Sequence, residues 1–312
     1  AITEPGVCYR DFEKETLARG LLLPSYTASK KLCTVGGMVA NNSAGEKTLS
    51  FGSTNRYVQG IKAILSDGNE YYFKPLDRNE LNEKLRTEGF EGNIYRNIYE
   101  LVNTHFDILQ NAKPRVSKNA AGYNLWNIWD KETFDLTQLF SGSQGTLGVI
   151  TEINFKLIKP KPFTELLVIF LGDLSDLGLI VNRILPHKPE SFESYDDHTL
   201  ELAEQFLPDI AHSLGEAIKS KIVLLAEFTG DTEDEALEKA RVAQTSLRGL
   251  KLNSTTITRD REDANKYWTI RRESFNLLRH HSGHDRTAPI IEDVIVRPEF
   301  LPEFLPRLYA IL

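Results

Sequence analysis

Cysteine is scarce in this chain of 312 residues, which contains two copies, Cys8 and Cys33. Two cysteines are too few for a disulfide framework, and without a C-x-x-C spacing we expect no iron–sulfur cluster held by this segment. No apolar run approaches the ~20 residues of a membrane-spanning helix, and residues 1–30 lack the pattern of a signal peptide. These absences predict a cytoplasmic protein without a transmembrane segment, and they leave peripheral association with a membrane open.

Methionine is rarer still, because Met38 is the single copy and the sequence therefore does not open on a start codon. Neither end of the chain has the composition of a tail. We expect a fragment of a longer protein that is truncated at both ends. An N-terminally processed chain is the milder alternative.

Positive charge is also in short supply, since 37 Lys and Arg stand against 44 Asp and Glu and give a formal net charge of −7. A protein that binds duplex nucleic acid needs a basic face, and no long run of Lys and Arg is present. Nucleic acid is therefore not an expected partner.

The length predicts two domains, because single hydrophobic cores usually stop growing below this size. The segment Lys159-Pro160-Lys161-Pro162 is the strongest boundary signal, so we expect domains at 1–160 and 161–312. Strands and helices interleave, which indicates an α+β fold. Hydrophobic patterning predicts strands at 58–65, 70–73, 148–157, 166–171 and 221–228, and helices at 11–23, 79–112, 173–184, 194–206, 232–247 and 262–278.

Two glycine-rich stretches, Thr34–Gly45 and Ser141–Ile150, are the candidate ligand-binding segments. Glycine admits positive φ and lets a ligand approach the backbone closely, and the second stretch leads directly into a predicted strand. Taken separately, the first stretch is more typical of a tight loop between two elements than of a ligand site, and the second does not identify a site by itself. A dinucleotide-binding G-x-G-x-x-G after a strand is absent, and Gly45-Glu46-Lys47-Thr48 does not complete a P-loop.

Several short motifs nevertheless occur in one order along the first half of the chain. They are Glu4–Val7, Pro24–Ser29, Thr34–Asn42, Leu49–Gly52, Ala63–Gly68, Lys118–Leu125 and Gly142–Thr151. This ordered set resembles the FAD-binding domain of the vanillyl-alcohol oxidase (PCMH-type) superfamily. It is most similar to the branch of D-lactate, glycolate-oxidase-type and D-2-hydroxyglutarate dehydrogenases. In the second half, Trp268–Glu273 and Ile291–Pro298 more loosely resemble segments of that family's substrate-side cap domain.

The resemblance implies a partial PCMH-type FAD-binding domain followed by the first part of an α+β cap domain with an antiparallel sheet. It also implies FAD as cofactor, with hydride passing from the α-carbon of a small, D-lactate-like 2-hydroxy acid to flavin N5. The electron acceptor is expected to be a quinone, cytochrome or iron–sulfur partner. The FAD positions carried over are Pro24, Ser29, Thr34, Gly36, Gly37, Asn42, Gly45, Gly52, Gly142, Gly145, Gly148 and Ile150.

Arg271 is the expected substrate residue, because a guanidinium grips a carboxylate through two parallel, charge-assisted hydrogen bonds. Its structural alternative is a solvated helix arginine or one bonded to Glu273. Lys118, Asn119 and Tyr123 are expected to line the flavin pocket through the same resemblance.

The chain also departs from the family pattern. Tyr26 and Thr27 replace an aspartate and a proline of the flavin loop, and Gln144 replaces a glutamate. Phe275 stands where some relatives have a substrate-binding threonine, which argues against 2-hydroxyglutarate in particular.

The family's G-G-G-T-S loop and H-x-G-x-G-N-x-H segment are not in the chain. The cluster of His280, His281 and His284 is interpreted as a polar loop, so no metal site is expected. A non-catalytic fragment without flavin and a sugar or alditol oxidase of the same superfamily remain the alternatives.

Overall fold

The computed structural model describes residues 1–282 and 294–311, apart from the side chains of Phe275, His280 and Ser282. The chain divides into two compact units, Ala1–Pro160 and Lys161–Leu312. The division falls inside the Lys159–Pro162 segment, where two prolines interrupt both helix and sheet hydrogen bonding. Both units combine helices with an antiparallel sheet, which confirms the predicted α+β fold.

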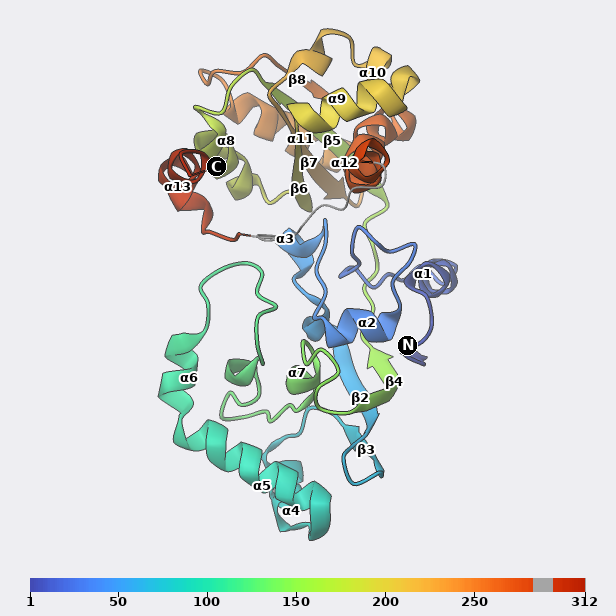
Figure 1. The fold of residues 1–312 in the computed structure, drawn as a ribbon, viewed down its shortest axis with the longest axis vertical. Coiled ribbons are helices and arrows are strands. Elements are labelled where there is room, and N and C mark those ends of the chain that lie inside the picture. The colour runs from blue at the N-terminus through green and yellow to red at the C-terminus, as the bar shows by residue number, and fades with distance from the viewer. Residues whose placement is uncertain (283–293, 312) are drawn as a thin grey trace. The chain divides into compact units, whose positions relative to one another are not determined.

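Unit 1 is built on a four-stranded antiparallel sheet in the order β1-β4-β2-β3 (Figure 1). Its strands are β1 (Ile2–Thr3), β2 (Val58–Ile64), β3 (Glu70–Phe73) and β4 (Val149–Phe155). The central pair, β2 and β4, contributes fully buried Ile61 and Ile153 to the core. A register shift between Lys62 and Ala63 brings Ile150 opposite Ala63.

The helices of unit 1 surround this sheet, and Tyr95 and Val102 of α5 pack into the same core as the strands. The helices are α1 (Tyr9–Leu17), α2 (Val35–Ala40), α3 (Thr48–Phe51), α4 (Arg78–Arg86), α5 (Gly89–Thr104), α6 (Phe106–Ala112) and α7 (Thr137–Phe140). A capping box of Asp77 and Glu80 starts α4, because each side chain accepts an otherwise unpaired backbone N–H.

Unit 2 holds a second antiparallel sheet in the order β6-β7-β5-β8. Its elements are β5 (Phe163–Leu171), α8 (Leu177–Ile184), β6 (Ser191–Asp196), α9 (Asp197–Phe206), α10 (Pro208–Ser213), β7 (Ile222–Gly230), α11 (Glu233–Ser246), β8 (Ser254–Ile257), α12 (Arg261–Ser282) and α13 (Leu301–Tyr309). Alternate residues of β5 enter two separate cores, one shared with α9 and α12 and the other with α8 and α11. Helices therefore cover both faces of this sheet (Figure 1).

Four element predictions need correction. The helix expected at 11–23 spans Tyr9–Leu17, because Leu22 instead exchanges backbone hydrogen bonds of 2.8 and 2.9 Å with Ile158. The helix expected at 79–112 is three helices, and Gly89 with φ +85° separates the first two.

In unit 2, Ser191–Asp196 forms β6 before the helix expected at 194–206 begins. The polar strand β8 was not predicted, because its four residues lack an apolar face.

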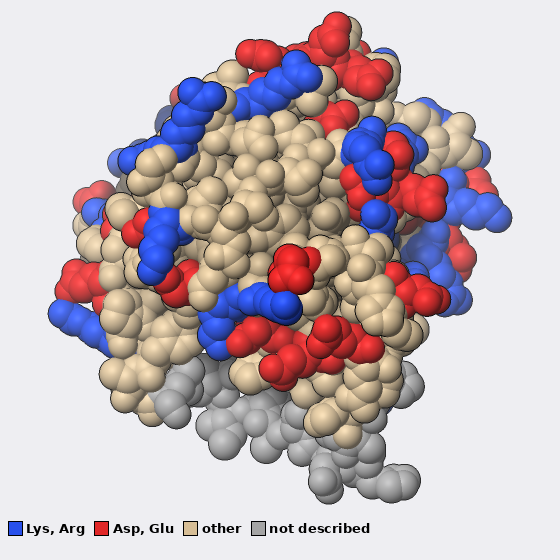
Figure 2. Space-filling model, turned by 90° about the horizontal axis from the view of Figure 1, so that it is seen from above, with Lys and Arg blue, Asp and Glu red and all other residues tan. Residues whose placement is uncertain are grey.

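Charge is mixed on the face that Figure 2 shows. Acidic and basic side chains lie next to one another around a broad area of uncharged residues. On this face the described residues therefore form no continuous basic surface of the kind that duplex nucleic acid requires. Within the same described residues, no helix combines the length and the apolar character needed to cross a membrane.

Candidate functional site

The two glycine-rich stretches lie against each other in unit 1, although about a hundred residues separate them in sequence. Gly142 donates its backbone N–H to Val39 O at 2.9 Å, and the N–H of Gln144 reaches Ala40 O at 2.8 Å. The Gln144 side chain adds a bond of 2.8 Å from Nε2 to Asn41 Oδ1. The end of α2 and the turn before β4 therefore form one surface.

The segment Lys118–Leu125 joins the same surface. The hydroxyls of Tyr123 and Thr146 lie 2.7 Å apart, and buried Asn124 donates from Nδ2 to Ser141 O at 3.1 Å. Three of the motifs that carried the family resemblance thus meet in space. Lys118 is half-buried in this loop, and Asn119 donates at 3.5 Å to Ala121 O within it.

The first glycine stretch forms a short helix, α2, where the sequence indicated a glycine-rich loop. Thr34 is the N-cap, and its Oγ1 accepts the N–H of Gly37 at 3.2 Å. Such a cap satisfies one of the backbone donors that a helix leaves unpaired at its start.

Three of the glycines predicted to bind FAD are required by packing within unit 1. A Cβ on Gly36 would lie 2.5 Å from Pro5 Cβ, and a Cβ on Gly45 would lie 2.0 Å from Tyr26 O. At Gly148 the nearest atom would be Ile64 O, at 2.6 Å. Each of these glycines therefore has a structural role that needs no ligand.

Other glycines of the same set lie open to a ligand. Gly37 and Gly145 are exposed, and a Cβ on Gly145 would meet nothing within 4 Å. Gly145, Gly142 and Gly52 have φ of +76°, +93° and +73°, a region that side-chain-bearing residues rarely adopt. Gly37 and Gly145 are thus the two glycines of the set at which a flat or anionic group can approach bare backbone.

The loop that contains Pro24 and Ser29 is held against this region by Gly45. Pro24 and Tyr26 are buried, and the Tyr26 hydroxyl donates to Glu46 Oε1 at 2.7 Å. Ser29 is exposed and lies 2.8 Å, between hydroxyl oxygens, from Thr27. The tyrosine that replaces the family's aspartate thus acts as a packing residue that anchors the loop.

Asn42 stabilises the surface that the end of α2 and the turn before β4 form, and this role can be tested by mutation. It is 3% exposed, has φ +46°, and accepts the N–H of Asn55 at 2.9 Å through Oδ1. We expect Asn42→Ala to lower the free energy of unfolding by about 2 kcal/mol, because the half-buried N–H of Asn55 loses its acceptor and alanine tolerates this φ poorly. Asn42→Gly should recover about half of that loss, since glycine adopts positive φ freely. Urea denaturation measures both variants, and an unchanged stability of Asn42→Ala would contradict the assignment.

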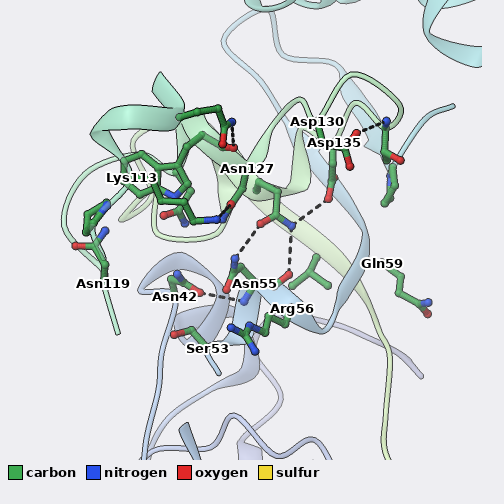
Figure 3. A pocket seen from close by; sticks show the side chains of 18 of the residues that line it. Asn42, Ser53, Asn55, Arg56, Gln59, Lys113, Asn119, Asn127, Asp130 and Asp135 are labelled. Atoms are coloured by element: carbon green, nitrogen blue, oxygen red, sulfur yellow. Dashed lines mark hydrogen bonds between the residues drawn. The ribbon is translucent and has the colours of Figure 1, made fainter. Parts of the chain in front are cut away.

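Beside Asn42, unit 1 contains a cavity of about 1040 Å³. Figure 3 shows Asn42, Ser53, Asn55 and Arg56 on one side of it and Asn127 and Asp130 on another. Its lining is rich in side-chain amides: Asn42, Asn55, Gln59, Gln110, Asn119, Asn124, Asn127 and Gln138. Two of the predicted site residues, Asn42 and Asn119, are therefore part of its wall.

The carboxylate of Asp135 is held inside this wall rather than presented to a ligand. Oδ1 accepts from the backbone and hydroxyl of Thr137 at 2.9 and 2.6 Å, and Oδ2 accepts from Gln138 at 3.0 Å. Burial raises the pKa of the Asp135 carboxyl, and these hydrogen bonds oppose the shift. Asp135 thus holds Thr137 and the amide side chain of Gln138 in place beside the cavity.

Arg271, the expected substrate residue, lies on α12 in unit 2. Its Nε and Nη2 bond the same oxygen, Glu193 Oε2, at 2.9 and 2.7 Å. Glu193 was not predicted as the partner of Arg271, because it lies on β6 and gives no local signal of the pairing. The alternative partner considered there, Glu273, bonds Asn276 instead. His280 and His281 lie in the last turns of α12, so the polar loop expected there is wrong for these two residues. His284 and the side chain of His280 lie outside the described residues.

Comparison with known protein families identifies both units. Residues 1–72 match the family described as FAD binding domain, and residues 161–312 match FAD linked oxidases, C-terminal domain. Domains of the FAD-linked oxidases are thus present in both units. The predicted membership of the vanillyl-alcohol oxidase superfamily is thereby confirmed, and FAD is the cofactor of the family.

Curated relatives of the chain include two D-2-hydroxyglutarate dehydrogenases. The Pseudomonas putida protein is 26% identical over 94% of the chain and 30% of the relative, and the Escherichia coli protein is 28% identical over 93% and 30%. Glycolate oxidase subunit GlcD of Bacillus subtilis is 27% identical over 95% of the chain and 51% of the relative. The chain thus spans about a third to a half of the length of these relatives.

Solved structures share the fold. Alkyldihydroxyacetonephosphate synthase aligns with 90% of the chain and 43% of its own length, with a TM-score of 0.56 at 15% identity. For p-cresol methylhydroxylase the TM-score is 0.51 at 16% identity, over 96% of the chain and 50% of that structure.

The residues of unit 1 fit a flavin dinucleotide in one physical respect. Gly37 and Gly145 leave backbone uncovered on a surface where three separate segments are locked together by hydrogen bonds. Such a surface admits a flat ring or a phosphate without a Cβ in the way. The assignment of individual residues to FAD remains a prediction.

Proposed function

We propose that the protein of which this chain is part oxidises a small 2-hydroxy acid to the corresponding 2-oxo acid. The observation that carries the proposal is the meeting of Thr34–Gly45, Lys118–Leu125 and Ser141–Ile150 in one surface. The names of the relatives, which include D-2-hydroxyglutarate dehydrogenase and glycolate oxidase, support the same substrate class. Bound FAD supplies the acceptor for the hydride that leaves the α-carbon.

The residues of the chain have two proposed tasks. In unit 1, the open backbone at Gly37 and Gly145 and the Tyr123–Thr146 pair hold the cofactor. In unit 2, Arg271 binds the substrate carboxylate, because its planar fork matches the two carboxylate oxygens. The electrons then pass to an acceptor of the quinone, cytochrome or iron–sulfur class.

FAD binding is tested first, on the purified chain. We expect incubation with FAD followed by desalting to leave a yellow protein that absorbs near about 450 nm, as protein-bound flavin does. FMN and riboflavin are matched controls, because they lack the adenylate half of FAD. A chain that stays colourless after incubation would contradict flavin retention by these two units and favour the non-catalytic alternative.

The substrate class is tested on the FAD-loaded full-length protein. Anaerobic mixing with D-lactate, glycolate or D-2-hydroxyglutarate should bleach the flavin absorbance, since hydride transfer reduces the ring. Sugars and alditols provide the comparison. Bleaching by sugars but by no hydroxy acid would overturn the proposed substrate class and support a sugar or alditol oxidase.

A further inference from the structure

The ion pair between Arg271 and Glu193 occupies only one hydrogen-bonding edge of the guanidinium. Nε and Nη2 both donate to Glu193 Oε2, at 2.9 and 2.7 Å, so the carboxylate takes the side edge of the guanidinium. Within the described part of the chain, Nη1 has no acceptor. As far as the described residues go, the outer edge, formed by Nη1 and Nη2, can therefore make two parallel bonds to a second carboxylate.

Among the described residues, Glu193 forms no side-chain interaction with a residue other than Arg271. Its described side-chain contacts are those with Arg271, and it is 21% exposed against 34% for the arginine. On the same face of β6, Ser191 and Tyr195 are 1% and 5% exposed, and neither hydroxyl has a hydrogen-bond partner among the described residues. Among the residues that the structure describes, Arg271 and Glu193 therefore pair only with each other, on a strand face whose neighbouring side chains are buried.

This isolation has a physical consequence for the arginine. A long side chain on a helix surface samples many rotamers, and ordering it for a ligand costs conformational entropy. Glu193 lies on β6, an edge strand whose residues pair with β7 from Ser191 to Asp196, so the sheet holds the backbone from which this carboxylate anchors the guanidinium. With that anchor in place, the direction of the outer edge is set before a ligand arrives.

We propose that Glu193 is a positioning residue that holds Arg271 by its side edge and thereby presents the outer edge to the substrate carboxylate. The inference rests on the proposed role of Arg271 in substrate binding. It adds a specificity element: the site selects a planar carboxylate rather than negative charge as such, because Glu193 already offsets the charge of the guanidinium.

The test uses the FAD-loaded full-length enzyme and compares a 2-hydroxy acid with its uncharged amide. We expect Glu193→Ala to raise KM for the acid roughly tenfold and Glu193→Gln roughly threefold, since glutamine keeps one oxygen acceptor but loses the charge. The kcat for the acid and both constants for the amide should stay within about twofold. A merely structural role for Glu193 would change acid and amide alike.

A double-mutant cycle shows whether Glu193 acts through Arg271. In the Arg271→Ala background, removing Glu193 should leave KM for the acid within about twofold. Asp197→Ala is the matched control, because Asp197 forms an ion pair of similar exposure with Lys221 in the same unit. That control should leave KM for the acid within about twofold of wild type.

Each remaining outcome has a defined meaning. A lower KM for the acid in Glu193→Ala would show that Glu193 competes with the substrate, and it would overturn the inference. The same holds if the loss in Arg271→Ala and the loss in Glu193→Ala simply add. If Arg271→Ala itself treats acid and amide like the wild type, the proposed function of Arg271 fails first and the inference fails with it. If Glu193→Ala does not fold, the nearly isosteric Glu193→Gln decides by the same acid-against-amide comparison.

Discussion

Replacing Arg271 with alanine in the FAD-loaded full-length enzyme should lower kcat/KM for a 2-hydroxy acid by at least about 100-fold and leave FAD affinity unchanged. Two charge-assisted hydrogen bonds to the carboxylate are lost, together about 3 kcal/mol, and each 1.36 kcal/mol is a factor of ten. Arg271→Lys should restore only a small part of the lost kcat/KM, because an ammonium keeps the charge but cannot donate two parallel hydrogen bonds as the planar guanidinium does. Steady-state kinetics and a flavin titration measure the two effects separately.

The control for this prediction is Arg259→Ala. Arg259 lies just before the same helix, its side chain is 82% exposed, and its Nε lies 3.6 Å from Oδ2 of its ion-pair partner, Asp263. Exposed ion pairs contribute about 0–1 kcal/mol, so this variant should behave like the wild type. An equal fall in FAD affinity and in kcat/KM for the acid in Arg271→Ala would refute the assigned role. It would mean that the arginine stabilises the fold and does not bind the substrate.

Replacing Gly45 with alanine should destabilise unit 1 by roughly 3 kcal/mol or more, which lowers its melting temperature by about 6–12 °C. The added Cβ would lie 2.0 Å from Tyr26 O and 3.0 Å from Thr27 Cα, and backbone atoms cannot rotate away as a side chain can. The loop that contains Pro24 and Ser29 would be displaced from α2 and α3. We therefore expect FAD retention to fall together with the melting temperature.

Gly6→Ala is the matched control, because a Cβ there would meet nothing within 4 Å. The φ of Gly45, like that of Gly6, is outside the left-handed region, so the comparison isolates the contact with the loop from backbone strain. Thermal unfolding followed by circular dichroism gives the stability difference. Indistinguishable melting temperatures for the two variants would show that the loop moves aside at no cost.

Much of the fold could be predicted because it depends on local patterns. The Lys159–Pro162 segment falls where the two compact units divide, and the apolar runs of β2 and β5 form strands as expected. The prediction missed β6, whose residues Glu193 and Ser194 interrupt the apolar alternation. It also extended the first helix through Leu22, because the backbone partner that draws this residue into a β-bridge, Ile158, lies far along the chain.

For the candidate site, too, some features follow from the sequence and others only from the tertiary structure. Glycine content and motif order are properties of the sequence, so the sequence by itself determined the family and its cofactor and predicted the segments of the site. Tertiary structure alone decided that Gly36, Gly45 and Gly148 serve packing while Gly37 and Gly145 lie open, because a glycine's neighbours come from distant segments.

Tertiary structure likewise decided the partner of Arg271. Local spacing offers Glu273, two residues along the helix, but residues two apart do not face each other on an α-helix. The sheet instead brings in Glu193 from β6, 78 residues away in sequence. The amino-acid order thus determined which chemical groups the protein possesses, and the packing of α12 on β6 determined which of them meet.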